Sequence, residues 1–91
     1  MKVINVNGSQ GSHYRSLGIT DWMARKGTSL KPSCSVCGCN QRATDGAHVV
    51  KVGSGDRRWY MMPACHAHNM SSDELELKSD WAYRLIPLEC L

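Results

Sequence analysis

The chain has 91 residues, enough for one small domain and too few for an enzyme with separate cofactor and substrate domains. Hydrophobic residues make up 42% of it, with three Trp, three Tyr and no Phe, so we expect a thin apolar core. Five cysteines and four histidines could brace that core, either as disulfides or as metal ligands. We expect a single domain over 1–91, with an N-terminal arm (1–33), a core (34–70) and an acidic tail (71–91).

The formal net charge is +3 at pH 7, and it is unevenly distributed. Residues 1–58 carry nine Lys and Arg against three Asp and Glu, whereas residues 59–91 carry two against five. A basic N-terminal part favours polyanionic partners, although an ordinary solvated surface can have the same composition. The charge alone therefore leaves open a nucleic acid, a protein partner and an ordinary surface.

Whether the cysteines form disulfides or bind a metal depends on the compartment in which the protein resides. The first residues lack the apolar stretch of a signal peptide, and no apolar run is long enough to span a bilayer. We therefore expect a cytoplasmic protein without a membrane partner. In a reducing compartment, closely spaced cysteines are more often metal ligands than disulfides, and complete pairing of five would leave one thiol over.

The N-terminal arm contains one expected helix. Residues 3–6 fit a short strand or a frayed terminus equally well. Thr20 or Asp21 can cap a short helix over residues 22–26, and Gly27 stands where a helix C-cap favours glycine. The arm is expected to pack onto a metal-centred core.

The core begins with a cysteine-rich turn at residues 34–39. Cys34 and Cys37 have the spacing that lets two sulfurs reach one ion, and Gly38 relieves the bend of such a zinc knuckle. Cys39 could replace either Cys34 or Cys37 as a metal ligand in this turn.

A hairpin and a helix are expected to follow the knuckle. Residues 47–52 and 57–62 are predicted to be its two strands, joined by a four-residue turn at 53–56. Pro63 is expected just ahead of a short helix within residues 64–70.

The spacing of Cys65 and His68 predicts a second pair of metal ligands. Residues three apart in a first helical turn lie on one face, where they can complete a tetrahedral zinc site with the knuckle. His66 is the alternate in this pair. The predicted ligands of structural Zn²⁺ are Cys34, Cys37, Cys65 and His68.

The tail is ambiguous between strand and helix. Leu75 and Leu77 alternate with charged residues as in a strand, whereas Ser71 with Glu74 forms a capping-box pattern. We expect irregular or strand-like structure here, with Cys90 as a thiol that binds no metal.

These motifs resemble those of the zinc-bearing HNH endonucleases, whose core is a ββα-metal finger of the treble-clef type. The resemblance covers about residues 34–70, through the knuckle, residues 46–50, the turn at 53–56 and residues 62–69. It implies an α+β fold, namely a small zinc-stabilised treble-clef domain to which the short N-terminal helix and the tail are added.

The resemblance also implies a reaction. In such nucleases the histidine of the first hairpin strand, here His48, is the general base that activates water for attack on a phosphodiester. A divalent ion such as Mg²⁺, distinct from the structural zinc, would be held by Asn69, with His66 as a candidate second ligand. The expected function is metal-dependent phosphodiester hydrolysis.

Two positions depart from the family pattern. Ala47 stands where a second metal ligand is common, and Tyr60 stands where the family has Asn. Asp45 is too near in sequence to replace that ligand directly unless the hairpin bends. The alternative hypothesis is therefore a non-catalytic zinc-finger module, possessing the same scaffold, that binds DNA or a protein partner.

Side chains that could contact nucleic acid lie in and beside the hairpin. Trp59 and Tyr60 could stack on bases, although core packing is the favoured interpretation for both, as for Trp22 and Trp81. Four basic residues could bind phosphates or form a solvated rim: Arg42, Lys51, Arg57 and Arg58.

Overall fold

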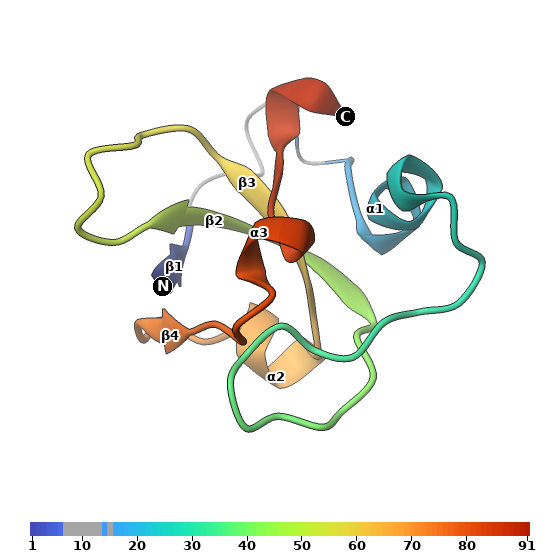
Figure 1. The fold of residues 1–91 in the computed structure, drawn as a ribbon, viewed down its shortest axis with the longest axis horizontal. Helices are drawn as coiled ribbons and strands as arrows, with labels where there is room; N and C mark the ends of the chain where they lie inside the picture. The colour runs from blue at the N-terminus through green and yellow to red at the C-terminus, as the bar shows by residue number, and fades with distance from the viewer. Residues whose placement is uncertain (7–13, 15) are drawn as a thin grey trace.

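A computed structural model describes residues 1–6, 14 and 16–91 (Figure 1). Five antiparallel strands form one sheet in the order β4-β1-β2-β3-β5. The strands are β1 (Lys2–Asn5), β2 (Asp45–Lys51), β3 (Tyr60–Ala64), β4 (Leu75–Glu76) and β5 (Ile86–Pro87). The helices are α1 (Ile19–Lys26), α2 (His66–Asn69) and α3 (Trp81–Arg84), followed by a 3₁₀ turn at Leu88–Cys90. The α+β class is confirmed.

The sheet draws strands from the arm, the core and the tail. β1 pairs with β2, where Ile4 lies opposite Val50, and on its other side with β4, where Val3 lies opposite Leu75. β5 extends the sheet at β3, where Met61 lies opposite Ile86. The N-terminal residues are therefore a strand, and the tail mixes two very short strands with a helix.

Strand alternation divides the buried side chains between two cores. The first core holds Tyr60, Met62 and Ala64 of β3, and the second holds Met61. The remaining buried members of the first core are Val3, Cys34, Val36, Ala47, Val49, Leu75, Leu77 and Leu85. Those of the second core are Ile19, Trp22, Ala43, Ile86 and Leu88.

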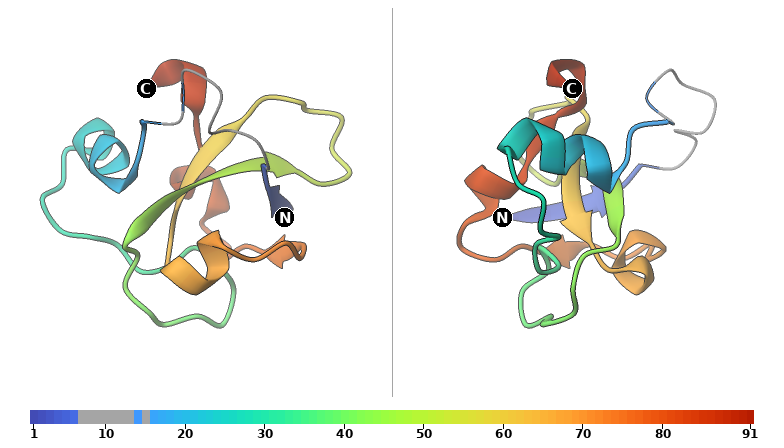
Figure 2. Two further views of the ribbon diagram at one scale, coloured as in Figure 1. Left: turned by 180° about the vertical axis from the view of Figure 1, so that it is seen from behind. Right: turned by 90° about the vertical axis from the view of Figure 1, so that its right-hand side faces the viewer.

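Helix α1 contributes Ile19 and Trp22 to the second core and lies against β2 and β3; Figure 2 shows the helix from two further sides. Gly18 is its N-cap, and the Asp21 carboxylate accepts the Gly18 N–H at 2.7 Å. The predicted caps, Thr20 and Asp21, therefore lie inside the helix. Gly27 ends it in the left-handed conformation, at φ 69°, as predicted.

The N-terminus of α1 approaches β2 at Gly46. A Cβ there would lie 2.7 Å from the backbone carbon of Gly18 and 2.7 Å from the Met61 Sδ atom. Only glycine permits this approach without displacing backbone. The contact fixes the segment before α1 against the face of β2 that also carries His48, because residues 46 and 48 share a face.

The hairpin differs from its predicted form in register and loop length. The strands pair from Asp45 with Ala64 to Val49 with Tyr60, so the connection spans 52–59 rather than four residues. The cause is Asp56, whose carboxylate accepts hydrogen bonds from the Arg58 N–H at 3.0 Å and from the Tyr60 hydroxyl. These bonds wind residues 56–58 around one carboxylate instead of placing them in a strand.

Pro63 also lies elsewhere than predicted. It is part of β3, opposite Gly46, and its carbonyl accepts hydrogen bonds from the Ser35 N–H and the Ser35 hydroxyl. β5 pairs only with Tyr60 and Met61, so the missing N–H of Pro63 breaks no pairing with β5. The helix begins later, at His66.

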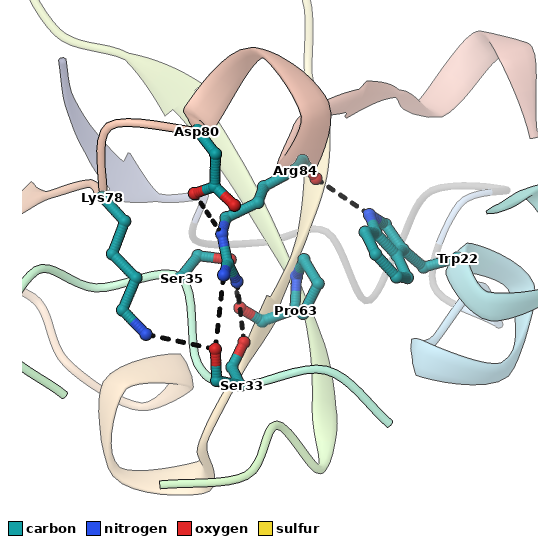
Figure 3. A network of polar contacts seen from close by, with 7 residues as sticks. All are labelled: Trp22, Ser33, Ser35, Pro63, Lys78, Asp80 and Arg84. Atoms are coloured by element: carbon teal, nitrogen blue, oxygen red, sulfur yellow. Dashed lines mark hydrogen bonds and ion pairs between the residues drawn. The ribbon is translucent and has the colours of Figure 1, made fainter. Parts of the chain in front are cut away.

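A buried arginine ties the tail to the segment before Cys34 (Figure 3). The Arg84 guanidinium donates to the Ser33 carbonyl at 2.8 Å and to the Asp80 carboxylate at 2.6 Å. Its side chain is only 10% exposed. The Trp22 indole N–H donates to the Arg84 carbonyl at 2.8 Å, so α1, α3 and the knuckle segment meet at this residue.

We expect Arg84→Ala to lower the free energy of unfolding by about 3 kcal/mol, since several charge-assisted hydrogen bonds would be lost from a buried site. The measurement is urea unfolding of the full chain. Arg58→Ala is the control, because its ion pair with Asp56 involves a side chain that is 55% exposed and should contribute little. Equal losses for the two variants would contradict the assigned role of Arg84.

Candidate metal centre

Three thiols and one imidazole converge at the junction of β3 and α2. The Sγ atoms of Cys34, Cys39 and Cys65 and a ring nitrogen of His68 all lie within 4.8 Å of one another. His68 Nδ1 is 3.4 Å from Cys34 Sγ and 3.3 Å from Cys65 Sγ. This group is the candidate metal centre.

The donor set and its spacing fit zinc. Tetrahedral Zn²⁺ with bonds of about 2.3 Å to sulfur and about 2.0 Å to nitrogen places S and N about 3.5 Å apart. The nitrogen–sulfur distances to His68 are close to that value. Three cysteines and one histidine are also a common set of structural zinc ligands. The site can therefore accommodate a metal ion such as zinc.

Cys39 belongs to this group, whereas Cys37, the expected second member of the knuckle pair, lies outside it. Cys37 is exposed, and its N–H donates to the Glu76 carbonyl at 2.8 Å. The neighbouring Val36 forms a bridge with Leu77, so this part of the loop is held against the tail. A turn through Gly38, at φ 82°, then brings Cys39 back toward the centre.

The other two members lie as their spacing predicts. Cys65 is the N-cap of α2, and the Asn69 N–H donates to its carbonyl, so Cys65 and His68 face the same side. The side-chain amide of Asn5 in β1 donates to the carbonyls of His68 and Ser71. The first strand therefore holds the helix that carries half of the donor set.

The thiols of the centre differ in acidity. Burial raises the pKa of the Cys34 thiol, which disfavours its thiolate. The pKa of Cys39 is lowered, chiefly by a backbone hydrogen bond from Gln41. A bound cation would stabilise both thiolates, as zinc binding requires.

His48, the expected general base, faces the second core. Its Nε2 lies 2.9 Å from the Leu17 carbonyl oxygen. A carbonyl oxygen only accepts, so Nε2 carries the hydrogen of this bond. This bond directs the ring toward the segment before α1.

Asn69, the expected ligand of a catalytic ion, reaches a different face. Its side-chain amide donates to Asp45 Oδ2 at 2.9 Å, and His66 Nδ1 lies 2.8 Å from the same oxygen. Along β2, Asp45 alternates with Gly46 and His48 and shares a face with Ala47, which is buried in the first core. His48 and Asn69 therefore contact opposite faces of the hairpin.

The cluster of Asp45, His66 and Asn69 was missed by the sequence reasoning, which set Asp45 aside. Partial burial acts to raise the pKa of the Asp45 carboxyl, but hydrogen bonds from His66, Asn69 and Thr44 outweigh it and hold the pKa below its usual range. No local sequence pattern indicates this cluster, because it depends on the register that places Asp45 opposite Ala64, at the end of β3 from which α2 starts.

Lys51 lies among aromatic rings rather than on an open surface. Its Nζ is 4.8 Å from the centre of the Tyr60 ring, 5.2 Å from that of Trp81 and 3.5 Å from Asp56 Oδ2. The side chain is only 16% exposed. Tyr60 is buried and Trp81 packs against the first core, so both are packing residues, as expected.

The three candidate arginines remain at the surface. Arg58 binds the Asp56 carboxylate, and Arg42 donates from Nη1 to the Lys31 carbonyl at 2.8 Å. Arg57 is exposed on the connection between β2 and β3. Arg57 and Arg42 therefore present positive charge to solvent, whereas Arg58 is paired with Asp56, a carboxylate that it shares with Lys51.

Comparison of the chain with family models, with curated proteins and with solved structures finds no match. The HNH resemblance thus rests on the motifs of the chain itself. Among residues 1–6, 14 and 16–91, no helix combines the length and apolar character needed to cross a membrane.

The geometry predicts different effects for mutations of Cys37 and Cys39. Cys39→Ser should abolish stoichiometric zinc binding and lower Tm by about 10 °C or more, because binding free energy at such a site is folding free energy. Cys37→Ser is the matched control and should retain one zinc, since Cys37 is exposed outside the group. Native mass spectrometry and thermal unfolding, each with and without a chelator, measure both effects. Loss of zinc from Cys37→Ser but not from Cys39→Ser would instead support the ligand set predicted from the sequence, which contains Cys37.

Proposed function

We propose that this chain is a zinc-stabilised, HNH-like module that binds nucleic acid. The carrying observation is the Cys3His group, which joins the loop before β2 to the junction of β3 and α2. The order β2–β3–α2 with metal donors at the helix is also the order of a ββα-metal finger. We therefore include a treble-clef arrangement in the proposal.

Surface charge supports nucleic acid as the partner. Arg57 and Arg42 are exposed, as are Lys2, Arg25 and Lys31. Side chains of this kind contact phosphate oxygens and supply affinity without reading sequence. Their number is small, so the expected binding is modest and depends on salt.

The arrangement of the hairpin favours binding over cleavage by the expected pair. His48 donates to the Leu17 carbonyl on one face, and Asn69 donates to Asp45 on the other. Ala47, at the position where the family commonly supplies a ligand, is fully buried in the first core. A base and an ion-binding amide on opposite faces do not act on one phosphodiester.

We expect the zinc-loaded chain to bind duplex DNA with an association constant that falls with salt, at a log–log slope of about −3. Arg57→Gln should reduce the magnitude of that slope by about one. Arg58→Gln is the control and should change it less, because Asp56 already neutralises this charge. Fluorescence anisotropy over a salt series measures the slope. Binding that is absent or insensitive to salt would instead indicate a protein partner.

Metal-dependent phosphodiester hydrolysis is the second candidate, and the cluster at Asp45 favours it. The Asp45 carboxylate and the Asn69 amide are oxygen donors of the kind that Mg²⁺ prefers, and His66 adds an imidazole. A divalent ion bound there would stabilise charge on a reacting phosphate. The chain's own residues would hold that ion on the face away from His48.

For this second candidate we expect Mg²⁺- or Mn²⁺-dependent cleavage of DNA that falls at least about a hundredfold in Asp45→Asn. His48→Gln should retain most of the activity, because His48 faces the second core. Zinc content and DNA affinity of both variants show whether the fold survives. No cleavage by the wild-type chain with either ion would reject hydrolysis and leave the binding module.

A further inference from the structure

A concave surface lies where the end of the hairpin connection meets the last turn of the chain. Tyr14, Arg58, Trp59 and Glu89 line a recess of about 250 Å³. A second recess of about 420 Å³ shares Tyr14 and Glu89 with the first and is apolar on its remaining side. Together the two recesses reach the size range of small-molecule sites, about 300–1,000 Å³.

The walls of this surface are two aromatic rings held by other contacts. The Tyr14 and Trp59 ring centres are 5.9 Å apart at an interplanar angle of 55°. Trp59 is partly buried and packs against the second core, and its carbonyl accepts the Leu88 N–H at 2.9 Å. The indole is therefore positioned by the fold, while part of it remains accessible at the recess.

The charged side chains among the described residues that line the surface are Arg58 and Glu89. Arg58 lies on the rim, where its guanidinium donates to Asp56. Glu89, on the 3₁₀ turn, is exposed and lines both recesses. Arg57, the exposed cation described above, directly precedes Arg58 in the chain. An aromatic wall and a carboxylate therefore occur at one place, and an exposed cation lies one residue before Arg58 in the chain.

We infer that this surface is a pocket for a single unstacked nucleobase, which gives the proposed module a preference for single-stranded nucleic acid. The base would stack on Trp59 and direct its hydrogen-bond donors at the Glu89 carboxylate, with its phosphate near Arg57. This inference rests on the proposed nucleic-acid binding. We call the surface formed by Tyr14, Arg58, Trp59 and Glu89 the base pocket.

The chemistry of the base pocket also selects among bases. An ionised carboxylate only accepts hydrogen bonds, so Glu89 favours a base edge with adjacent donors. Guanine offers two such donors, at N1 and N2, whereas thymine offers one, at N3. Paired bases within a duplex present neither these edges nor their faces, so the base pocket would not distinguish duplexes.

The test uses the zinc-loaded full chain and fluorescein-labelled octamers of thymidylate, with or without one central guanine, and a duplex control. We expect the guanine-containing strand to bind at least about five times more tightly than octathymidylate. Trp59→Leu should weaken single-strand binding by about five- to a hundredfold while leaving duplex binding unchanged, and Trp59→Phe should retain most of it. Glu89→Gln should remove the guanine preference alone.

The controls separate this inference from the proposed function. Arg42→Gln, outside the base pocket, should weaken single-strand and duplex binding alike. Unchanged single-strand binding in Trp59→Leu, or a retained guanine preference in Glu89→Gln, would overturn the base pocket. Duplex binding by the same chain would still support the proposed nucleic-acid module. Glu89 is exposed, so its variant remains informative if Trp59→Leu fails to fold. Binding of neither nucleic acid by the wild-type chain would reject the proposed function and the base pocket together.

Discussion

The convergence of Cys34, Cys39, Cys65 and His68 is the constraint on which the rest of the structure depends. It joins a loop without regular secondary structure to the end of the central hairpin, in a chain with few aromatic residues for a core. Three thiols at such short separation become thiolates only when a cation compensates their charge, and burial of Cys34 strengthens that requirement. Metal binding and folding are therefore expected to be one equilibrium in this protein.

Residues of the arm and the tail position the donors of this centre through hydrogen bonds. Asn5 in β1 holds two carbonyls at the end of α2, and the Glu76 carbonyl in β4 holds Cys37 away from the donors. Arg84 connects the tail to Ser33, immediately before the first ligand. Each contact joins residues that are distant in the chain, so the donor geometry depends on the whole sheet. The same contacts therefore order both the candidate metal ligands and the strands.

The two faces of the hairpin separate side chains that the HNH motif would place together at one site. One face carries His48 toward α1, and the other carries Asp45 toward His66 and Asn69. The proposed nucleic-acid module does not require His48, because the exposed cations and the aromatic recess do not depend on that side chain. Hydrolysis, in contrast, would have to be organised around Asp45. Resemblance of a motif thus indicates a scaffold more directly than it indicates a reaction, since the reaction needs side chains on one face.

The sequence by itself determined the features that arise from local interactions. The Gly27 cap, a strand pair followed by a short helix, and the common face of Cys65 and His68 follow from neighbouring residues and helical spacing. Only the tertiary structure decided between Cys37 and Cys39 and between the two faces for His48. The physical reason is that these outcomes depend on Glu76, Leu77 and Leu17, partners some 30 to 40 residues away whose pairing leaves no local pattern.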